Sequence, residues 1–163
     1  MDYDDDGVLD FISGSYDPGD IYLFRGSEEG KYEKVQQILD KSGQPVVHHP
    51  KEFAKYTKLK DDVAADNDDL IMARVASFGS WVTPVDWESD GDLDLLIRSF
   101  GGELFLRVNE GTRSKPVYGT ESVQIEVDGK PLKVYAHANP VVADWNADGV
   151  WDLVVSSGDG SVG

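Results

Sequence analysis

Short apolar runs separated by turn-forming residues dominate the chain. Runs at residues 9–12 and 21–25 flank a turn at 16–20, and runs at 93–97 and 103–108 flank a Gly pair. Apolar runs of this length bounded by Gly, Asp and Pro predict β-strands, and two runs across a tight turn predict a hairpin. The runs at 9–12 and 93–97 are apolar almost throughout, which is typical of strands covered on both faces. Further strands are predicted at residues 81–85, 123–127, 132–135, 140–143 and 151–155.

A nine-residue acidic loop occurs three times and leads each time into an apolar run. Every copy has oxygen-bearing side chains at positions 1, 3, 5 and 9 and Gly at position 6. Hard cations such as Ca²⁺ take several oxygen ligands at short range, and one Gly permits the tight turn that gathers them. The pattern therefore predicts calcium binding within a repeat. The copies are loop 1 (residues 2–10), loop 2 (residues 86–94) and loop 3 (residues 144–152).

The spacing of the loops predicts how the chain is organised. Loops 2 and 3 begin 58 residues apart, whereas loops 1 and 2 begin 84 residues apart. About four strands per loop favours a β-propeller of small antiparallel sheets. The extra length falls in a mostly polar stretch with only a hint of helix at residues 52–60, which we interpret as a surface insertion. The predicted boundaries are a partial blade at 1–43, the insertion at 44–70, a blade at 71–130 and a truncated blade at 131–163.

The first loop positions also match an EF-hand, a helix–loop–helix calcium motif. That motif needs a bidentate Glu at position 12, where this chain has Ser13, Ile97 and Val155. It also needs flanking helices, where this chain predicts strands. The acid at position 9 must therefore complete each site.

The loop pattern, Asp-x-Asp/Asn-x-Asp-Gly-x-x-Asp between two strands, resembles the FG-GAP or VCBS-type repeats of β-propellers, which include integrin α-subunit heads and many bacterial secreted proteins. Phe78-Gly79 resembles the FG element, while Thr83-Pro84 stands about where the GAP element would lie. The resemblance implies an all-β fold: a partial β-propeller of four-stranded antiparallel blades with calcium-binding hairpin loops. It covers nearly the whole chain except the insertion.

The resemblance also implies that the side chains at positions 1, 3, 5 and 9 and the carbonyl of position 7 hold Ca²⁺. Glu88 departs from the family pattern, because position 3 is normally Asp or Asn and a longer arm reshapes the site. The residues so assigned are Asp2, Asp4, Asp6, Val8 and Asp10 in loop 1, Asp86, Glu88, Asp90, Asp92 and Asp94 in loop 2, and Asp144, Asn146, Asp148, Val150 and Asp152 in loop 3.

Composition narrows the classes of partner. The chain has 163 residues, a formal net charge of −16 and no Cys. A surface this acidic repels nucleic acid and anionic membranes, and no apolar stretch approaches the ~18 residues of a membrane span. The start of the chain shows no signal-peptide pattern, and both ends adjoin repeat elements, which predicts a fragment of a longer protein.

Several features have two interpretations. A single Asp-Gly loop is also compatible with a metal-free acidic turn, although three copies favour metal. The aromatic residues at loop position 2, Tyr3, Trp87 and Trp145, fit a sugar-stacking rim, but packing against a neighbouring sheet is the favoured interpretation. His48 and His49 are interpreted as solvated rather than metal-binding, and the acidic stretch at 61–69 as a solvated face. His137 has no identifiable catalytic partner.

No catalytic constellation stands out in the sequence: there is no Cys nucleophile, Gly-x-Ser-x-Gly elbow, phosphate-binding Gly loop or zinc motif. The leading hypothesis is a non-catalytic, calcium-stabilised module of a secreted or cell-surface protein. It would bind extracellular protein or glycan ligands and pack against the remaining blades of its own polypeptide. The competing hypothesis is the propeller portion of a secreted carbohydrate-active enzyme, with catalytic residues outside this chain.

Overall fold

The computed structural model describes residues 1–61, 68–134 and 139–156, and the chain is mostly β with two short helices. The helices are α1 (Pro50–Leu59) and α2 (Asp68–Ser77). The strands are β1 (Phe11–Gly14), β2 (Ile21–Phe24), β3 (Gln36–Gln37), β4 (Ser80–Val85), β5 (Asp94–Ser99), β6 (Leu104–Arg107), β7 (Val123–Gln124), β8 (Glu126–Val127), β9 (Lys130–Pro131), β10 (Asn139–Ala143) and β11 (Asp152–Ser156).

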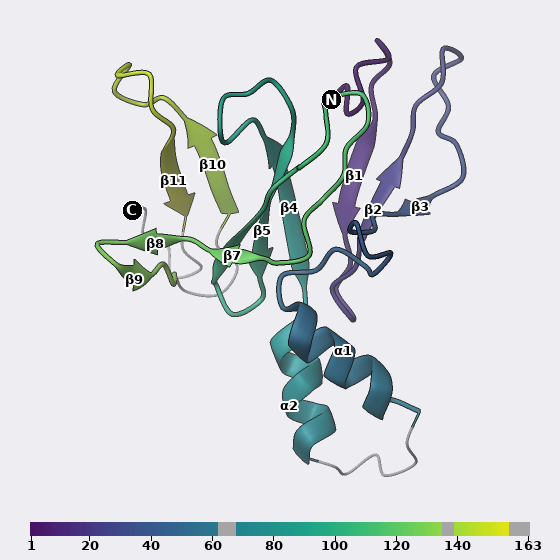
Figure 1. Ribbon diagram of the computed structural model, residues 1–163, viewed down its shortest axis with the longest axis vertical. Coiled ribbons are helices and arrows are strands. Elements are labelled where there is room, and N and C mark those ends of the chain that lie inside the picture. The colour runs from purple at the N-terminus through teal and green to yellow at the C-terminus, as the bar shows by residue number, and fades with distance from the viewer. Residues whose placement is uncertain (62–67, 135–138, 157–163) are drawn as a thin grey trace.

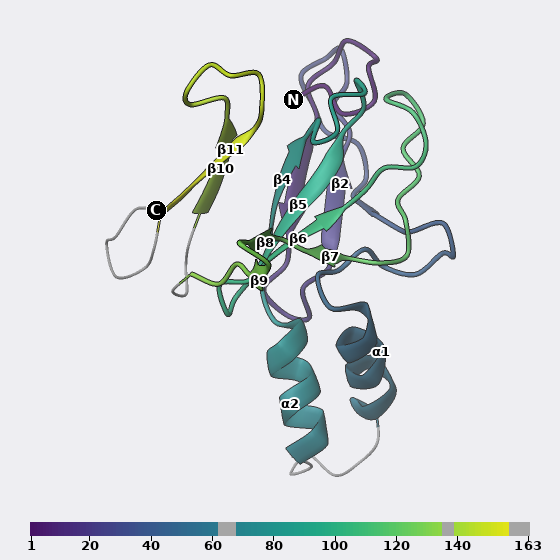
Figure 2. The same ribbon diagram turned by 60° about the vertical axis from the view of Figure 1, so that its left-hand side comes forward.

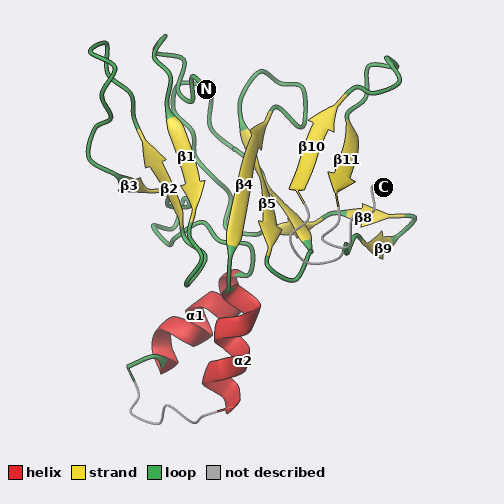
Figure 3. Cartoon of the chain, turned by 180° about the vertical axis from the view of Figure 1, so that it is seen from behind, coloured by secondary structure: helices red, strands yellow, loops and turns green. Residues whose placement is uncertain are grey.

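The strands form three principal antiparallel sheets that lie side by side. Sheet 1 has the order β1-β2-β3, sheet 2 the order β4-β5-β6-β7, and sheet 3 is the β10-β11 hairpin. Sheet 2 lies in the middle, with β8-β9 as a small separate hairpin near its edge (Figure 1). The three acidic loops lie at one end of the sheets and the two helices at the other, as the view from behind also shows (Figure 3).

Most of the predicted hairpins are confirmed. Phe11 pairs with Phe24 across β1-β2, and Leu96 pairs with Leu106 across β5-β6. The predicted strands at 81–85 and 140–143 are β4 and β10. The hairpin expected at 123–135 is shorter, since only β8 and β9 pair around a turn at Asp128-Gly129. Residue 135, the last of the predicted run at 132–135, lies outside the described residues.

The middle sheet is covered on both faces. Every residue of β5 and β6 is buried. Leu95 and Ile97 lie in the core shared with sheet 1. Leu96 lies in the core shared with sheet 3, beside Val142 and Leu153. The two-sided burial predicted for residues 93–97 is therefore confirmed, because side chains that alternate along β5 meet a sheet on each side.

The same prediction is wrong for residues 9–12. Ile12 packs against the core between sheets 1 and 2, whereas Phe11 points the other way and is 52% exposed. Sheet 1 is at one end of the row of described sheets (Figure 1), partly hidden behind sheet 2 in the turned view (Figure 2), so its outer face has no neighbouring sheet among the described residues. Both runs open with Leu-Asp followed by two apolar residues. The difference in burial at these positions therefore comes from the neighbouring sheets.

The insertion forms a helical hairpin that extends away from the sheets. Pro50 at the start of α1, Glu52 in its first turn and Lys58 in its last turn suit a helix and its dipole. The Lys55 ammonium pairs with the Asp69 carboxylate at 3.0 Å and so links the two helices. The sequence pattern indicated a helix only at 52–60, so α2 and the extension of the insertion to Ser77 are additions from the structure. Neither helix is long and apolar enough to cross a membrane among the residues described.

His48 is buried, so its interpretation as a solvated side chain is wrong. Its Nδ1 lies 3.0 Å from the Ser80 hydroxyl and its Nε2 lies 3.1 Å from the carbonyl of Ala76 in α2. The same hydroxyl lies 2.6 Å from the carbonyl of Gly19, beyond the end of β1. Burial, together with the neighbouring charge of His49, lowers the pKa of His48 to about 4. The imidazole therefore joins the insertion to sheets 1 and 2 in its neutral form.

Candidate metal centre

The three acidic loops share one pattern of backbone hydrogen bonds. In loop 1 the Asp2 carboxylate accepts from the backbone N–H groups of Asp6 at 3.1 Å and Gly7 at 3.0 Å. Asp86 makes the same two bonds in loop 2 at 2.9 and 3.1 Å, and Asp144 makes them in loop 3 at 3.0 Å each. Position 1 therefore organises each turn.

Glycine at position 6 is required by the backbone. Gly7, Gly91 and Gly149 adopt φ angles of 85°, 93° and 85°, which lie in the left-handed region. A side chain on Gly7 would meet no atom within 4 Å, so conformation rather than space selects Gly there. The residues at position 4 are also left-handed, with φ near 60° in all three copies. The repeated motif thus encodes a repeated backbone conformation.

The carboxylate at position 9 accepts hydrogen bonds from backbone N–H groups in the loop and, in loops 1 and 2, also from the chain beyond it. The two carboxylate oxygens of Asp94 accept from the N–H of Trp87 at 3.1 Å and from that of Asn109 at 2.8 Å. Asp10 makes the equivalent bonds, with Tyr3 and Gly26, both at 2.8 Å. Asn109 and Gly26 follow the next strand of each sheet, so position 9 ties the loop to the chain returning past it. Burial raises the pKa of Asp94 above its ordinary value.

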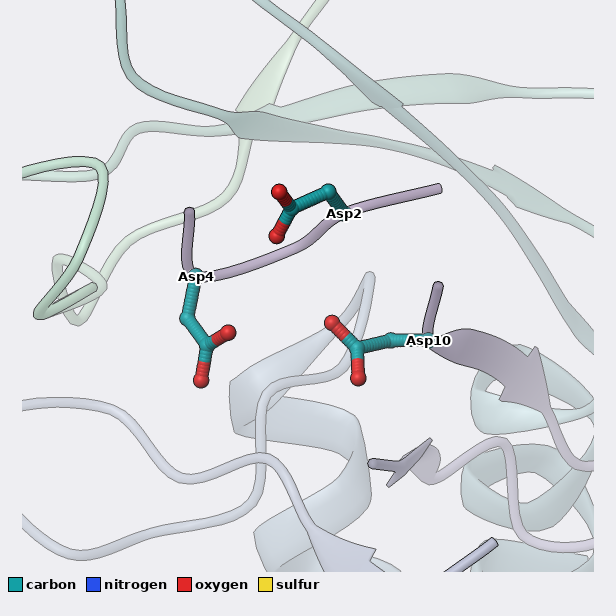
Figure 4. A group of neighbouring side chains, drawn as sticks. All are labelled: Asp2, Asp4 and Asp10. Atoms are coloured by element: carbon teal, nitrogen blue, oxygen red, sulfur yellow. The ribbon is translucent and has the colours of Figure 1, made fainter. Parts of the chain in front are cut away.

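Loop 1 brings three carboxylates together. Oxygen atoms of Asp2, Asp4 and Asp10 all lie within 4.8 Å of one another, and Figure 4 shows their side chains around a common space. The Asp4 side chain is only 10% exposed. One of its oxygens pairs with Arg25, while Oδ1 is buried without a hydrogen-bond partner. A buried carboxylate oxygen without a donor is costly, and a bound cation would satisfy it.

The remaining predicted ligands are arranged differently. Asp6 lies outside the loop 1 group, and its carboxylate accepts from the N–H of Val8 at 2.8 Å. Glu88 and Asp90 are exposed in loop 2. In loop 3 the Asn146 amide donates to the Asp148 carboxylate at 2.9 Å. Across the part of the chain that the structure describes, loop 1 alone brings three or more carboxylate or histidine side chains to such close range.

The backbone N–H of position 7 makes the same hydrogen bond in all three loops, but the side chain at this position is an acid only in loop 2. The backbone N–H of Val150, like that of Val8, donates to the acid at position 5, at 2.9 Å. Asp92 does the same at 3.1 Å, and its own carboxylate is buried with one oxygen lacking a partner. Burial first, and then the charges of Asp90 and Asp94, raise the pKa of Asp92. Loop 2 thus buries an extra acid that the sequence assigned to the metal only through its carbonyl.

The aromatic residues at position 2 have three different environments. Tyr3 is buried, and its hydroxyl lies 2.8 Å from that of Tyr118 across the core of sheets 1 and 2. Burial raises the pKa of Tyr3 to about 12. Trp87 packs against the core between sheets 2 and 3. Trp145 is 78% exposed, so the prediction of packing is confirmed for the first two aromatics and wrong for the third.

Two cationic groups at loop 1 were not foreseen from the sequence. Arg25, just beyond β2, forms an ion pair with Asp4, and the Arg113 guanidinium donates to the backbone carbonyl of Asp2. Arg113 is 111 residues from Asp2 in the chain. Nothing in the loop motif itself predicts either contact. The position of Arg25 just beyond the end of β2, the strand paired with β1, is the only signal in the sequence that places it near the loop.

Comparison with known proteins gives no relative: no family model matches the chain, and neither the curated proteins nor the solved structures contain a match.

Proposed function

We propose that this chain is a calcium-stabilised module of the FG-GAP or VCBS type. It would form part of a β-propeller in a secreted or cell-surface protein and bind extracellular protein or glycan ligands without catalysis. The observation that carries the proposal is the convergence of Asp2, Asp4 and Asp10 around a buried carboxylate oxygen that has no donor. The recurrence of one loop backbone in three places supports it.

The electrostatics of loop 1 favour a divalent cation. Three carboxylates within 4.8 Å repel one another when no cation lies between them. Arg25 offsets part of that charge at Asp4, but among the described residues neither Asp2 nor Asp10 forms an ion pair with a cationic side chain. All the groups offered are oxygens, which suit calcium. Because protein atoms would fill most of its coordination shell, we assign the ion a structural role.

The arrangement of sheets supports the blade part of the proposal. Sheet 2 has four antiparallel strands, and its faces pack against sheets 1 and 3 through apolar side chains. A propeller repeats small four-stranded sheets in this face-to-face manner. The three loops lie at the same end of their sheets, as expected when each loop marks one repeat (Figure 1).

Calcium titration tests the proposal. We expect calcium at about 100 times its Kd to add about 2.7 kcal/mol to the free energy of unfolding, which is about 5–10 °C in Tm for a chain of this size. Asp4→Asn should weaken calcium binding at least tenfold in calorimetry, because it removes charge from a ligand oxygen. A melting temperature that does not change at saturating calcium would contradict the structural-ion proposal.

Asp5→Asn is the matched control within the same loop. Asp5 is exposed at position 4, outside the converging group, and has φ = 60°, a conformation that Asn adopts readily. It removes the same formal charge one residue away from Asp4. Equal losses of affinity in both variants would mean that general acidity, rather than the built site, attracts the ion.

A glycan array on the intact protein, with calcium and with chelator, addresses the ligand class. We expect calcium-dependent binding to a defined set of glycans if the ligand is a saccharide, because the loops are ordered by the ion. If no glycan on the array is bound with calcium present, the result would count against sugar binding and leave protein ligands as the proposal.

A further inference from the structure

Among the described residues, the outer sides of sheets 1 and 3 each present an uncovered apolar face. Phe11 and Phe24 pair across β1-β2 with their ring centroids 5.6 Å apart, and Phe11 is half-exposed. Across β10-β11, Val141 pairs with Val154, and Val141 is 55% exposed. We call these the sheet-1 outer face (Phe11, Ser13, Tyr22, Phe24) and the sheet-3 outer face (Val141, Val154).

The residues after each position 9 acid follow a fixed rule of facing. The first residue after the acid faces the preceding sheet: Leu95 packs towards sheet 1, and Leu153 packs towards sheet 2. The second residue faces the following sheet: Ile12 packs towards sheet 2, and Leu96 packs towards sheet 3. Each internal interface therefore joins a second-residue face of one sheet to a first-residue face of the next.

The paired strands obey the same rule. Ile21 and Leu23 of β2 lie in the core shared with sheet 2, and Leu104 of β6 lies in the core shared with sheet 3. Val85 of β4 also faces sheet 3, whereas Val142 of β10 faces sheet 2. The rule thus also holds for the strands that pair with β1, β5 and β11. It is therefore a property of the repeat rather than of one contact.

One face of each type is left without a partner in the described chain. Phe11 is the first residue after Asp10, so the sheet-1 outer face is of the type that receives a preceding sheet. Val154 is the second residue after Asp152, so the sheet-3 outer face is of the type that packs on a following sheet. The two uncovered faces are therefore one second-residue face and one first-residue face, which is the same pairing that forms each internal interface.

We propose that the chain associates head to tail with a second copy of itself, the sheet-3 outer face of one copy packing on the sheet-1 outer face of the next. The contact continues the series of interfaces between sheets 1, 2 and 3. It rests on the propeller part of the proposed function, with a second copy supplying the neighbouring blades, and it does not depend on bound calcium. Because the two surfaces differ, the interface is heterologous, and it either closes into a ring or extends.

The chemistry of the faces suits this occupant. The named residues of both faces carry no formal charge, although the chain as a whole has a net charge of −16. Repulsion between copies therefore arises away from the contact and is screened by salt, while aromatic and branched aliphatic side chains meet at the contact. Association should strengthen as the salt concentration rises.

Sedimentation of two variants tests the proposal. Wild type should show a mass that rises with concentration beyond that of the monomer. Phe11→Asp breaks the sheet-1 outer face and Val141→Asp breaks the sheet-3 outer face, so each variant alone should lose association and sediment as a monomer. An equimolar mixture should recover a heterodimer and nothing larger, because each variant retains the face that the other lacks.

Val127→Asp is the matched control. Val127 is 54% exposed on β8, outside both faces, so this variant should associate as wild type does. All three variants should fold, since the substituted side chains are at least half exposed, and circular dichroism checks this. Measurements with calcium and with chelator keep this test separate from that of the metal site.

Three results would overturn the proposal. A wild-type chain that remains monomeric at every concentration and salt level would mean that another partner covers these faces. Association of Val141→Asp alone would indicate a symmetrical contact between two sheet-1 outer faces. Failure of the mixture to form a heterodimer, with both variants folded, would show that the two faces do not bind each other.

Discussion

The acidic end and the helical end of the sheets are held together by different kinds of contact. At the acidic end, most hydrogen bonds within a loop join residues four to seven positions apart, as between Asp2 and Asp6 or between Tyr3 and Asp10. At the helical end, His48 and Ser80 are 32 residues apart and Ser80 and Gly19 are 61 apart. The backbone of each acidic loop is thus set mainly by contacts within the loop, whereas the junction at the helical end is made by contacts between distant segments.

The difference shows in how often each arrangement recurs. The local contacts of the acidic end appear three times with nearly the same distances and φ angles, because each loop carries its own determinants. Among the described residues the junction around His48 occurs once, because it needs the insertion, the turn after β1 and the start of β4 in one place. Local motifs can be repeated along a chain, whereas a tertiary junction is specific to its position.

The acidic loops also differ from one another in how deeply the acid at position 9 is buried. Asp94 is fully buried, with both oxygens bound to backbone N–H groups, whereas Asp152 is partly exposed and accepts from Trp145 at 2.9 Å. We therefore expect the Asp at position 9 to contribute more to the free energy of unfolding in sheet 2 than in sheet 3.

The largest expected effect comes from Asp94→Ala. Two backbone donors lose their acceptor, at about 1–3 kcal/mol each, partly offset because a buried carboxylate is removed, so we expect a loss of about 3 kcal/mol. Asp152→Ala removes the equivalent acid in sheet 3, and we expect a loss of about 1 kcal/mol. Urea unfolding of both variants with chelator present measures the difference without a contribution from calcium.

Equal losses in the two variants would contradict this account. They would mean that position 9 acts through the local loop alone and that the anchoring of the chain at Asn109 contributes little. A larger loss in Asp152→Ala would point to sheet 3, rather than sheet 2, as the region that limits stability.

A smaller effect is expected from pH at the helical end. The pKa of His48 is lowered from 6.5 to about 4 in the folded chain, so between these values the unfolded chain binds more protons. Stability is therefore fully present above pH 6.5 and is lost as the pH falls towards 4. By pH 5 we expect this histidine to account for a loss of about 2 kcal/mol.

An NMR titration of the His48 ring measures the pKa directly, and a midpoint near 6.5 would contradict it. Unfolding of His48→Gln across the same pH range provides the control, because that variant should lose much less stability between pH 7 and 5. His49 and Glu103 lie close enough to act on His48 in opposite directions, so Glu103→Gln should lower its midpoint further.

Sequence reasoning recovered the parts of the fold that depend on local pattern. The hairpins β1-β2 and β5-β6, the strands β4 and β10, and the two-sided burial of β5 all follow from short apolar runs and the turns between them. It missed α2, whose buried positions are limited to Ala73 and Ser77, so its sequence shows no clear apolar face. It also misread His48, because a polar neighbourhood in sequence says little about burial in space.

The candidate metal site shows the same division. The sequence picked out the three loops and predicted which of their residues bind a cation, and the structure gives all three loops a common backbone. Only the structure placed Asp2, Asp4 and Asp10 within 4.8 Å, paired Arg25 with Asp4 and brought Arg113 to the loop from 111 residues away. The two arginine contacts depend on segments outside the loop, and nothing near the motif in the sequence indicates them.

The sequence by itself determined the strands, the turns and the left-handed positions of the acidic loops, because short-range sterics and hydrogen bonds act within a few residues. Tertiary structure decided which faces are covered, which acids converge and which histidine loses its proton. Burial and proximity depend on the neighbours that folding brings together. For this reason identical positions such as Phe11 and Leu95 end in different environments, one half-exposed and the other buried between two sheets.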